Sequence, residues 1–336
     1  MKFSTTYWIP SIAIIALTAT EIALRLAFGL GNPVLSQADA DTGYRFQPNQ
    51  KLSRFGKTIE YNQYSQRSEP ITLEKPQGTL RILMIGDSVL NGGNPTDQSQ
   101  ILSELFKAKL STSQDSTQVL NASAGSWGIG NQLGYLRKFG TFQADAVILQ
   151  IGTHDLIQPK STSERVGRDP NYPNQAPLLA IQELVSRYAL PKTTRLLKLN
   201  SSSTEIPEVA SNQQKLQFEQ NMESFKNIVN RLRTENIPVF VLYTPNRADL
   251  LPNFNSPPYK SEFFQLLKSL EIPVIDTHTN WSNLPPATVV TYFRDQVHLS
   301  VAGNQAAAEL LFQQLCMKRQ STACSQNLAR FSALKP

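Results

Sequence analysis

The sequence predicts an α/β fold built on a doubly wound, mostly parallel open sheet. Short apolar runs rich in Val, Ile and Leu, typical of parallel strands covered on both faces, lie at 80–86, 117–123, 145–152, 238–244 and 272–277. Segments with helical periodicity alternate with them, at 99–110, 130–140, 211–235, 259–270 and 301–317. Ligands of such sheets bind outside the carboxyl ends of the strands, so a functional site is expected in the residues directly after these runs.

The N-terminal residues Tyr7–Leu30 form the most membrane-like stretch, long enough to span a bilayer. Glu21 and Arg25 lie inside it, four residues apart, where a helix would bring them together. We expect residues 1–30 to be an uncleaved signal anchor, with the membrane as a partner and the catalytic domain outside the cytoplasm, in the periplasm or at the cell surface. A signal peptide with the apolar core Ile9–Ala19, or a soluble amphipathic helix, is the alternative.

The rest of the chain divides by composition. Residues 31–79 are polar and turn-rich and indicate a stalk with a small β-hairpin extension. The α/β domain is expected at 80–317, interrupted by an insertion at 157–210 that is rich in Pro, Ser and Asn and holds one helix around 176–190. A loop of this length is a lid, a binding insertion or a disordered segment. A C-terminal tail follows at 318–336.

Two cysteines, Cys316 and Cys324, lie near the C-terminus. A disulfide between them is plausible if the domain lies outside the cytoplasm. As a metal pair they lack further Cys or His residues nearby, and two ordinary thiols remain the other interpretation.

The charge pattern excludes one class of partner. The formal net charge is +6, and the basic residues are dispersed along the chain. No basic tract with interleaved aromatic residues is present, so we expect no nucleic-acid partner.

Two blocks carry residues suited to nucleophilic catalysis. Gly86-Asp87-Ser88 ends the first strand, where a glycine permits a sharp turn that exposes a serine hydroxyl; a helix N-cap is the alternative. Asp295 and His298 precede the last helix, three residues apart. An aspartate there can orient the imidazole and leave Nε2 free as a base, which is what a serine nucleophile requires.

With these blocks the sequence resembles the SGNH (GDSL-type) hydrolase family over about Leu80–Leu315. The resemblance implies a flavodoxin-like, three-layer sandwich in which Ser88 is the nucleophile and Asp295 and His298 complete the triad. It implies no cofactor and no metal. The family's second block resembles NASAGSWG at 121–128, so the oxyanion hole is expected from the backbone N–H groups of Ser88 and of Gly125 or Ser126.

The third block of the family, G-x-N-D, is matched by Gly152-Thr153-His154-Asp155. Here His154 stands where the family has asparagine, and we expect its imidazole to replace the amide as an oxyanion donor. The alternatives are a metal site shared with His278, Asp155 and Asp276, and a purely structural histidine. We assign Asp87 and Asp155 to shaping their loops.

The resemblance implies a membrane-anchored serine esterase of bacterial type. The expected reaction is removal, or transfer, of O-acyl groups on extracytoplasmic glycans, and Tyr172 and Tyr188 of the insertion are candidate sugar contacts. The alternatives are a catalytically reduced binding or assembly protein of the cell envelope, a lipase or thioesterase acting on longer acyl esters, and an anion-binding module with the same strand pattern.

Overall fold

The computed structural model describes residues 8–111, 116–190 and 207–317. Its centre is a five-stranded parallel sheet in the order β6-β5-β7-β8-β9. The strands are β5 (Leu80–Gly86), β6 (Thr117–Ser123), β7 (Ala146–Gly152), β8 (Val239–Thr244) and β9 (Val274–Asp276). The predicted α/β fold with a parallel open sheet is confirmed.

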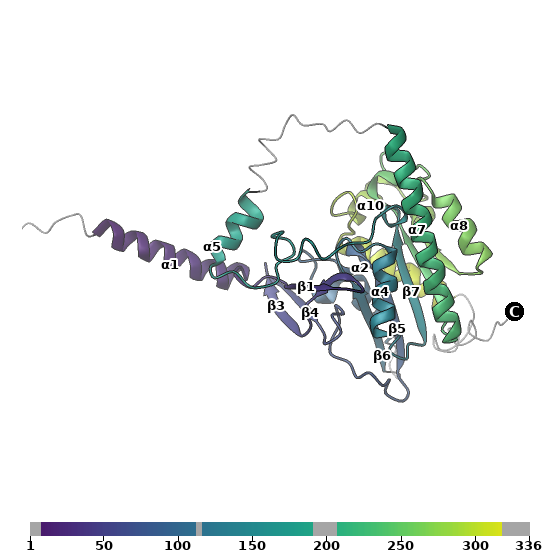
Figure 1. The fold of residues 1–336 in the computed structure, drawn as a ribbon, viewed down its shortest axis with the longest axis horizontal. Helices are drawn as coiled ribbons and strands as arrows, with labels where there is room; N and C mark the ends of the chain where they lie inside the picture. Colours follow the sequence, from purple (N-terminus) through teal and green to yellow (C-terminus); the bar gives the residue numbers. More distant parts are fainter. Residues whose placement is uncertain (1–7, 112–115, 191–206, 318–336) are drawn as a thin grey trace, which may run out of the picture.

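Alternate side chains along each strand point into two apolar layers, one on each face of the sheet. Leu83, Ile85 and Leu149 face one side, which is covered by α4 (Ile129–Phe139), α7 (Pro207–Thr234) and α8 (Lys260–Ser269). Ile82, Met84 and Ile148 face the other side, which is covered by α3 (Leu102–Leu110) and α11 (Val301–Phe312). Both faces of the sheet are therefore buried, which explains why the strands read as continuous apolar runs. Figure 1 shows α4 and α7 in front of the sheet.

The order of the strands in the sheet determines where the candidate site lies. The chain begins the sheet in β5, steps to β6 on one side, and then places β7, β8 and β9 on the other side. The crossover direction therefore reverses between β5 and β7, and a crevice opens at their carboxyl ends. The residues that follow β5 and β7 are Asp87, Ser88 and His154.

Residues 36–61 form two antiparallel hairpins. One pairs β1 (Ser36–Asp39) with β2 (Gly43–Phe46), and the other pairs β3 (Gln50–Arg54) with β4 (Lys57–Tyr61). The single small hairpin expected in this region is therefore two hairpins. Tyr44 of β2 is buried in the core layer beneath α4.

The N-terminal helix α1 (Trp8–Phe28) extends away from the domain (Figure 1). Its segment Pro10–Phe28, with a mean hydropathy of 1.7, is long and apolar enough to cross a membrane, and none of it is buried. Membrane anchors and N-terminal signal sequences share these properties.

The remaining described elements are short. They are α2 (Ser88–Asn91), η2 (Gln98–Gln100), η3 (His154–Leu156), α5 (Ala180–Glu183), η4 (Leu184–Ala189), η5 (Arg247–Asp249), α9 (Thr277–Trp281), α10 (Pro286–Val289), η6 (Val290–Tyr292) and η7 (Gln313–Met317). Cys316 falls in η7, whereas Cys324 and the predicted tail lie outside the described residues, so the disulfide stays a prediction.

Candidate active site

Ser88 is the first residue of α2, directly after the turn that ends β5. A glycine at position 86 lets Gln150 and Leu90 pack against the backbone, because a Cβ there would lie 2.5 Å from Oε1 of Gln150 and 3.0 Å from Cβ of Leu90. Asp87 caps the helix by accepting a hydrogen bond from the backbone N–H of Val89 over 2.8 Å. The N-cap predicted as the alternative is thus Asp87, and Ser88 beside it is half-buried.

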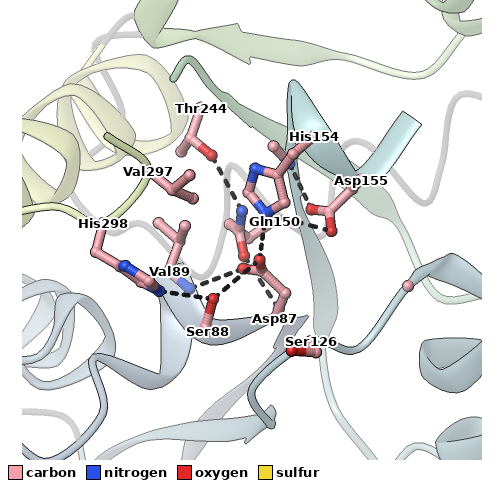
Figure 2. Close-up of polar contacts among 12 residues, drawn as sticks. Asp87, Ser88, Val89, Ser126, Gln150, His154, Asp155, Thr244, Val297 and His298 are labelled. Atoms are coloured by element: carbon pink, nitrogen blue, oxygen red, sulfur yellow. Dashed lines mark hydrogen bonds and ion pairs between the residues drawn. The ribbon is translucent and has the colours of Figure 1, made fainter. Parts of the chain in front are cut away.

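Ser88, His298 and Asp295 are connected by hydrogen bonds. The Oγ of Ser88 lies 2.9 Å from Nε2 of His298, and Nδ1 of His298 lies 2.8 Å from Oδ2 of Asp295 (Figure 2 shows the Ser88–His298 contact). The aspartate fixes the tautomer that leaves Nε2 facing the serine as an acceptor. The three side chains singled out in the sequence therefore meet across the carboxyl edge of the sheet in the geometry of a nucleophile, a base and its orienting group.

The loop before α11 fixes Asp295. One carboxylate oxygen accepts hydrogen bonds from the backbone N–H groups of Val297 and His298, over 2.9 and 2.8 Å. Although partial burial works in the opposite direction, these bonds and the His298 ring lower the pKa of the Asp295 carboxyl. Asp295 is therefore ionised at neutral pH, as an orienting carboxylate must be.

The turn after β6 carries the predicted oxyanion residues. Ser126 has a φ of +58°, in the left-handed region that favours glycine. Gly125 is fixed by Tyr44, whose hydroxyl donates a hydrogen bond to its carbonyl oxygen. Two residues of the insertion also contact Ser126. The hydroxyl of Ser161 donates a hydrogen bond to the carbonyl oxygen of Ser126, and the hydroxyl of Tyr172 lies 3.2 Å from Oγ of Ser126.

His154 lies on the other side of Asp87 from Ser88 (Figure 2). Its Nε2 is 2.6 Å from Oδ2 of Asp87, and its Nδ1 is 3.1 Å from Oδ1 of Asn246, the amide that follows β8. Both ring nitrogens are thus engaged with oxygen acceptors, and neither offers a free N–H to an oxyanion. The expectation that His154 replaces the family's asparagine as an oxyanion donor does not fit this arrangement.

The charges of this cluster are coupled. Although burial disfavours a charged ring, the neighbouring carboxylates of Asp155 and Asp87 raise the pKa of His154 to about 10. Burial also opposes ionisation of Asp87, but the His154 ring holds the pKa of its carboxyl below the ordinary value. Burial and the Asp87 charge raise the pKa of Asp155 to about 8. At neutral pH the charged ring of His154 therefore pairs with the carboxylate of Asp87.

Asp155 shapes its own loop, since its Oδ2 accepts the backbone N–H of Gly152 over 2.7 Å. Its other oxygen, Oδ1, is buried without a hydrogen-bond partner, 3.7 Å from Nε2 of His154. An unpaired buried oxygen is tolerated more readily on a neutral acid than on a carboxylate, which agrees with the raised pKa.

Asp87, His154 and Asp155 are described residues close enough to share a cation, with one ligand atom of each within 4.8 Å of the others. The 2.6 Å between His154 and Asp87 is a hydrogen-bond distance. Two ligand atoms of a tetrahedral zinc site lie farther apart, roughly 3.3 Å, because each metal–ligand bond is about 2.0 Å long. His278 and Asp276, the other metal candidates from the sequence, contact Lys260 instead of His154.

Several residues that support the site carry no motif in the sequence. Gln150 accepts the backbone N–H of Asp87 over 3.2 Å, and Asn246 accepts from His154. Arg67 is fully buried and donates to the carbonyl oxygens of Asn91, Gly93 and Thr96, which fixes the loop after α2. The one available signal was position, since Asn246 follows the fourth strand as His154 follows the third.

A hollow of about 440 Å³ adjoins the cluster. It is lined by Thr153, His154, Ile157, Gln158, Pro159, Asn246, Asp249 and Pro258. Its wall therefore combines the His154–Asn246 pair with the start of the insertion. Tyr188, in contrast, lies beside Arg54 and Phe55 at the base of α1.

A parallel α/β sheet with a serine, a histidine and an aspartate joined at its carboxyl edge defines a serine hydrolase type of site. The comparison with family models then places the chain: residues 84–306 match the GDSL-like lipase/acylhydrolase family, and the protein belongs to that family.

The chain is also similar to solved structures at low sequence identity. The lipase/acylhydrolase from Enterococcus faecalis is 15% identical, with 72% of this chain and 99% of that chain covered and a TM-score of 0.43. A catalytic mutant of an acetylxylan esterase from Geobacillus stearothermophilus is 13% identical, with 70% and 93% covered and a TM-score of 0.43. A comparison with curated proteins gives no match.

Proposed function

We propose that this member of the acylhydrolase family is a membrane-anchored serine esterase that acts on O-acylated glycans outside the cytoplasm. The observation that carries the proposal is the 2.9 Å contact between Ser88 Oγ and His298 Nε2, backed by Asp295. An alcohol is a weak nucleophile, and an oriented imidazole at hydrogen-bond distance is the group that activates it.

The proposed reaction has two steps. Oγ of Ser88 attacks the ester carbonyl carbon while its proton passes to Nε2 of His298. When the tetrahedral intermediate collapses, the departing alkoxide takes that proton and leaves as an alcohol. Water, activated by the same imidazole, then attacks the acyl-enzyme and releases the acid. A sugar hydroxyl in place of water would make the same site an acyltransferase.

The oxyanion is assigned to backbone donors. The N–H groups of Ser88 and Ser126 make no hydrogen bond with other groups in the described part of the chain, which leaves them available to a ligand. Ser88 begins a short helix whose capping group is Asp87, and Ser126 lies in a turn held from outside by Tyr44 and Tyr172. Fixed donors of this kind stabilise the developing charge without reorganising during the reaction.

The glycan substrate and the extracytoplasmic location rest on the apolar helix α1 and on the open carboxyl edge of the sheet. Asp295 and His298 are partly exposed, so a bulky acylated polymer can approach the triad without entering a closed tunnel.

Covalent labelling of Ser88 tests the proposal. A fluorophosphonate probe should label the wild-type protein and not Ser88→Ala, and Ser88→Ala should lower hydrolysis of a fluorogenic acetyl ester by about 10³-fold or more. Ser123→Ala, which changes a buried hydroxyl near the site, is the matched control and should still be labelled. A probe that labels Ser88→Ala as well as the control would show that another residue is the nucleophile. A probe that labels neither the wild type nor the control would indicate a catalytically reduced binding protein.

Activity on acetylated and long-chain esters separates the remaining alternatives. A glycan esterase should prefer the acetyl ester of a sugar to a long-chain acyl ester. The reverse preference would indicate a lipase or thioesterase.

A further inference from the structure

The helical segment 180–189 of the insertion is amphipathic, but its charged side chain faces inward and its apolar side chains face outward. Its acidic side chain Glu183 is 4% exposed, whereas the apolar Leu184 and Val185 are 36% and 43% exposed. The two leucines that precede it, Leu178 and Leu179, are 90% and 52% exposed. A helix at a water-facing surface shows the opposite pattern, with apolar residues inward, so this segment is suited to an apolar exterior.

The inner, polar face of this segment is anchored to the base of the N-terminal extension. The Glu183 carboxylate forms an ion pair with Arg54, which is fully buried. Its Oε2 also accepts the backbone N–H of Gly31 over 2.7 Å. The buried charges are therefore paired within the protein, and the orientation that exposes the leucines is fixed.

The same segment is hydrogen-bonded to α1. The carboxylate of Glu21 accepts the backbone N–H groups of Ala180 and Ile181 over 2.7 and 3.1 Å. Arg25 donates to the carbonyl oxygen of Leu178 over 2.8 Å and to Glu21 over 2.6 Å. The two charges inside the apolar α1, which the sequence left without a role, thus satisfy the free backbone groups at the start of α5.

Aromatic rings continue this apolar surface around the end of α1. Phe55, at the tip of the β3–β4 hairpin, is 43% exposed, and its ring centroid lies 6.1 Å from Phe28 and 5.7 Å from Tyr188. Aromatic rings gather at the level of lipid headgroups in membrane proteins. The exposed apolar residues of α1, Phe55 and the insertion therefore form one surface.

The length of α1 places this surface at the bilayer boundary. Its candidate membrane span, Pro10–Phe28, has 19 residues and is roughly 28 Å long at 1.5 Å per residue, close to a hydrocarbon core of about 30 Å. A bilayer around α1 therefore reaches the turn that carries Glu21 and Arg25, where α5 is attached. Figure 1 shows α5 leaving α1 steeply, so that a bilayer crossed by α1 would lie along α5.

We propose that Phe55, Leu178, Leu179, Leu184 and Val185 form a membrane-contact surface that inserts into the lipid interface beside α1. This surface rests on α1 being the anchor of the proposed esterase. It gives the domain a second attachment, so that the catalytic edge is held in one orientation to the membrane. Interfacial helices of this kind bury their apolar face roughly 5–10 Å into the headgroup and acyl boundary.

Depth-dependent fluorescence quenching tests the surface in the full chain. In a background of Cys316→Ser and Cys324→Ser, a fluorophore sensitive to its environment is attached to Leu184→Cys, to Leu17→Cys in α1, or to Leu216→Cys. Leu216, on α7, is 56% exposed and serves as the matched control. Each protein is reconstituted in vesicles of phosphatidylcholine and phosphatidylglycerol that carry a nitroxide at a shallow or a deep acyl position.

We expect the shallow nitroxide to quench the Leu184→Cys label more than the deep nitroxide does, and at least about twofold more than it quenches the Leu216→Cys label. The Leu17→Cys label should instead be quenched most by the deep nitroxide. Quenching at Leu17→Cys without quenching at Leu184→Cys, repeated at Val185→Cys, would overturn the contact surface and leave the anchor intact. Loss of quenching at both Leu17→Cys and Leu184→Cys would overturn the anchor and the surface together. Probe labelling of Ser88 in the same vesicles reports the catalytic proposal separately.

Discussion

His154 pairs with Asp87 across 2.6 Å between Nε2 and Oδ2, the carboxylate oxygen that also faces Ser88. Asp87 Oδ2 also lies 3.4 Å from Ser88 Oγ, so this carboxylate is next to the proposed nucleophile. An unpaired carboxylate about 4 Å from a developing oxyanion would oppose it by about 4 kcal/mol at an effective dielectric constant of 20. We expect the imidazolium of His154 to neutralise that charge and so to support the reaction through Asp87.

The first prediction concerns this pair. His154→Asn should lower kcat for an acetyl ester by about 10- to 100-fold and destabilise the fold by about 3 kcal/mol, because it leaves the buried Asp87 charge unpaired. The double variant Asp87→Asn/His154→Asn should regain part of the lost stability, since both charges are then removed. Chemical denaturation and ester turnover of these two variants and of the single variant Asp87→Asn measure the coupling. If His154→Asn were as active as the wild type, the amide would be serving as an oxyanion donor, as in the family's usual block.

The second prediction is a pH dependence of stability. The pKa of His154 is about 10 in the folded state, above the value of about 6.5 expected in the unfolded chain. The charged ring therefore stabilises the folded state fully below pH 6.5, and this contribution to the free energy of unfolding is lost as the pH rises toward 10. The raised pKa of Asp155 acts in the same direction up to about pH 8. The free energy of unfolding should therefore fall by roughly 1 kcal/mol or more between pH 7 and 9.5. Urea titrations of the detergent-solubilised wild type and His154→Gln measure it, and equal slopes with pH in both would contradict the assignment.

The third prediction tests the orientation of His298. Asp295→Asn should lower kcat by about 10²- to 10⁴-fold, because the amide cannot fix the required tautomer of the imidazole. Asp295 is exposed in its loop, so thermal unfolding should change little. A loss of activity matched by an equal loss of folded protein would indicate a structural role instead.

The fourth prediction concerns the strained turn after β6. Ser126→Gly should keep esterase activity and stabilise the protein by up to about 1 kcal/mol, because glycine adopts the φ of +58° without steric cost. Ser126→Val should destabilise it, since a β-branched residue is poorly accommodated there. Melting temperatures of the two variants decide the matter, and a more stable Ser126→Val would show that the turn relaxes to another conformation.

The fifth prediction extends the site to the N-terminal hairpins. Tyr44→Phe removes the hydroxyl that holds the Gly125 carbonyl, a hydrogen bond worth about 1 kcal/mol, and should lower kcat about fivefold with little change in KM. Tyr61→Phe, which loses a buried hydroxyl bonded to Asn91 on the other side of the site, is the matched comparison. A change confined to KM would place Tyr44 in substrate binding and not in support of the oxyanion turn.

The sequence by itself determined the strands and the positions of the candidate triad. Apolar runs such as LRILMIG can be recognised as strands from a short stretch of sequence. The turn at Gly86 and the Asp295–His298 pair are likewise formed by residues close together in the sequence. Because parallel strands align their carboxyl ends, the position of Ser88 after the first strand was enough to predict the edge of the sheet on which it lies. His298 follows no strand directly, and it was predicted from its spacing to Asp295 before the last helix.

The tertiary structure alone decided what contacts each of the other residues. His154 binds Asp87 and Asn246 because the reversal of strand order between β5 and β7 sets their loops side by side, and no local pattern encodes that contact. The support of Gly125 by Tyr44, and the attachment of Ala180 to Glu21, join segments 81 and 159 residues apart. Such pairings depend on how separate elements pack, so the residue types predicted the chemistry available at the site and the packing determined which partners each residue has.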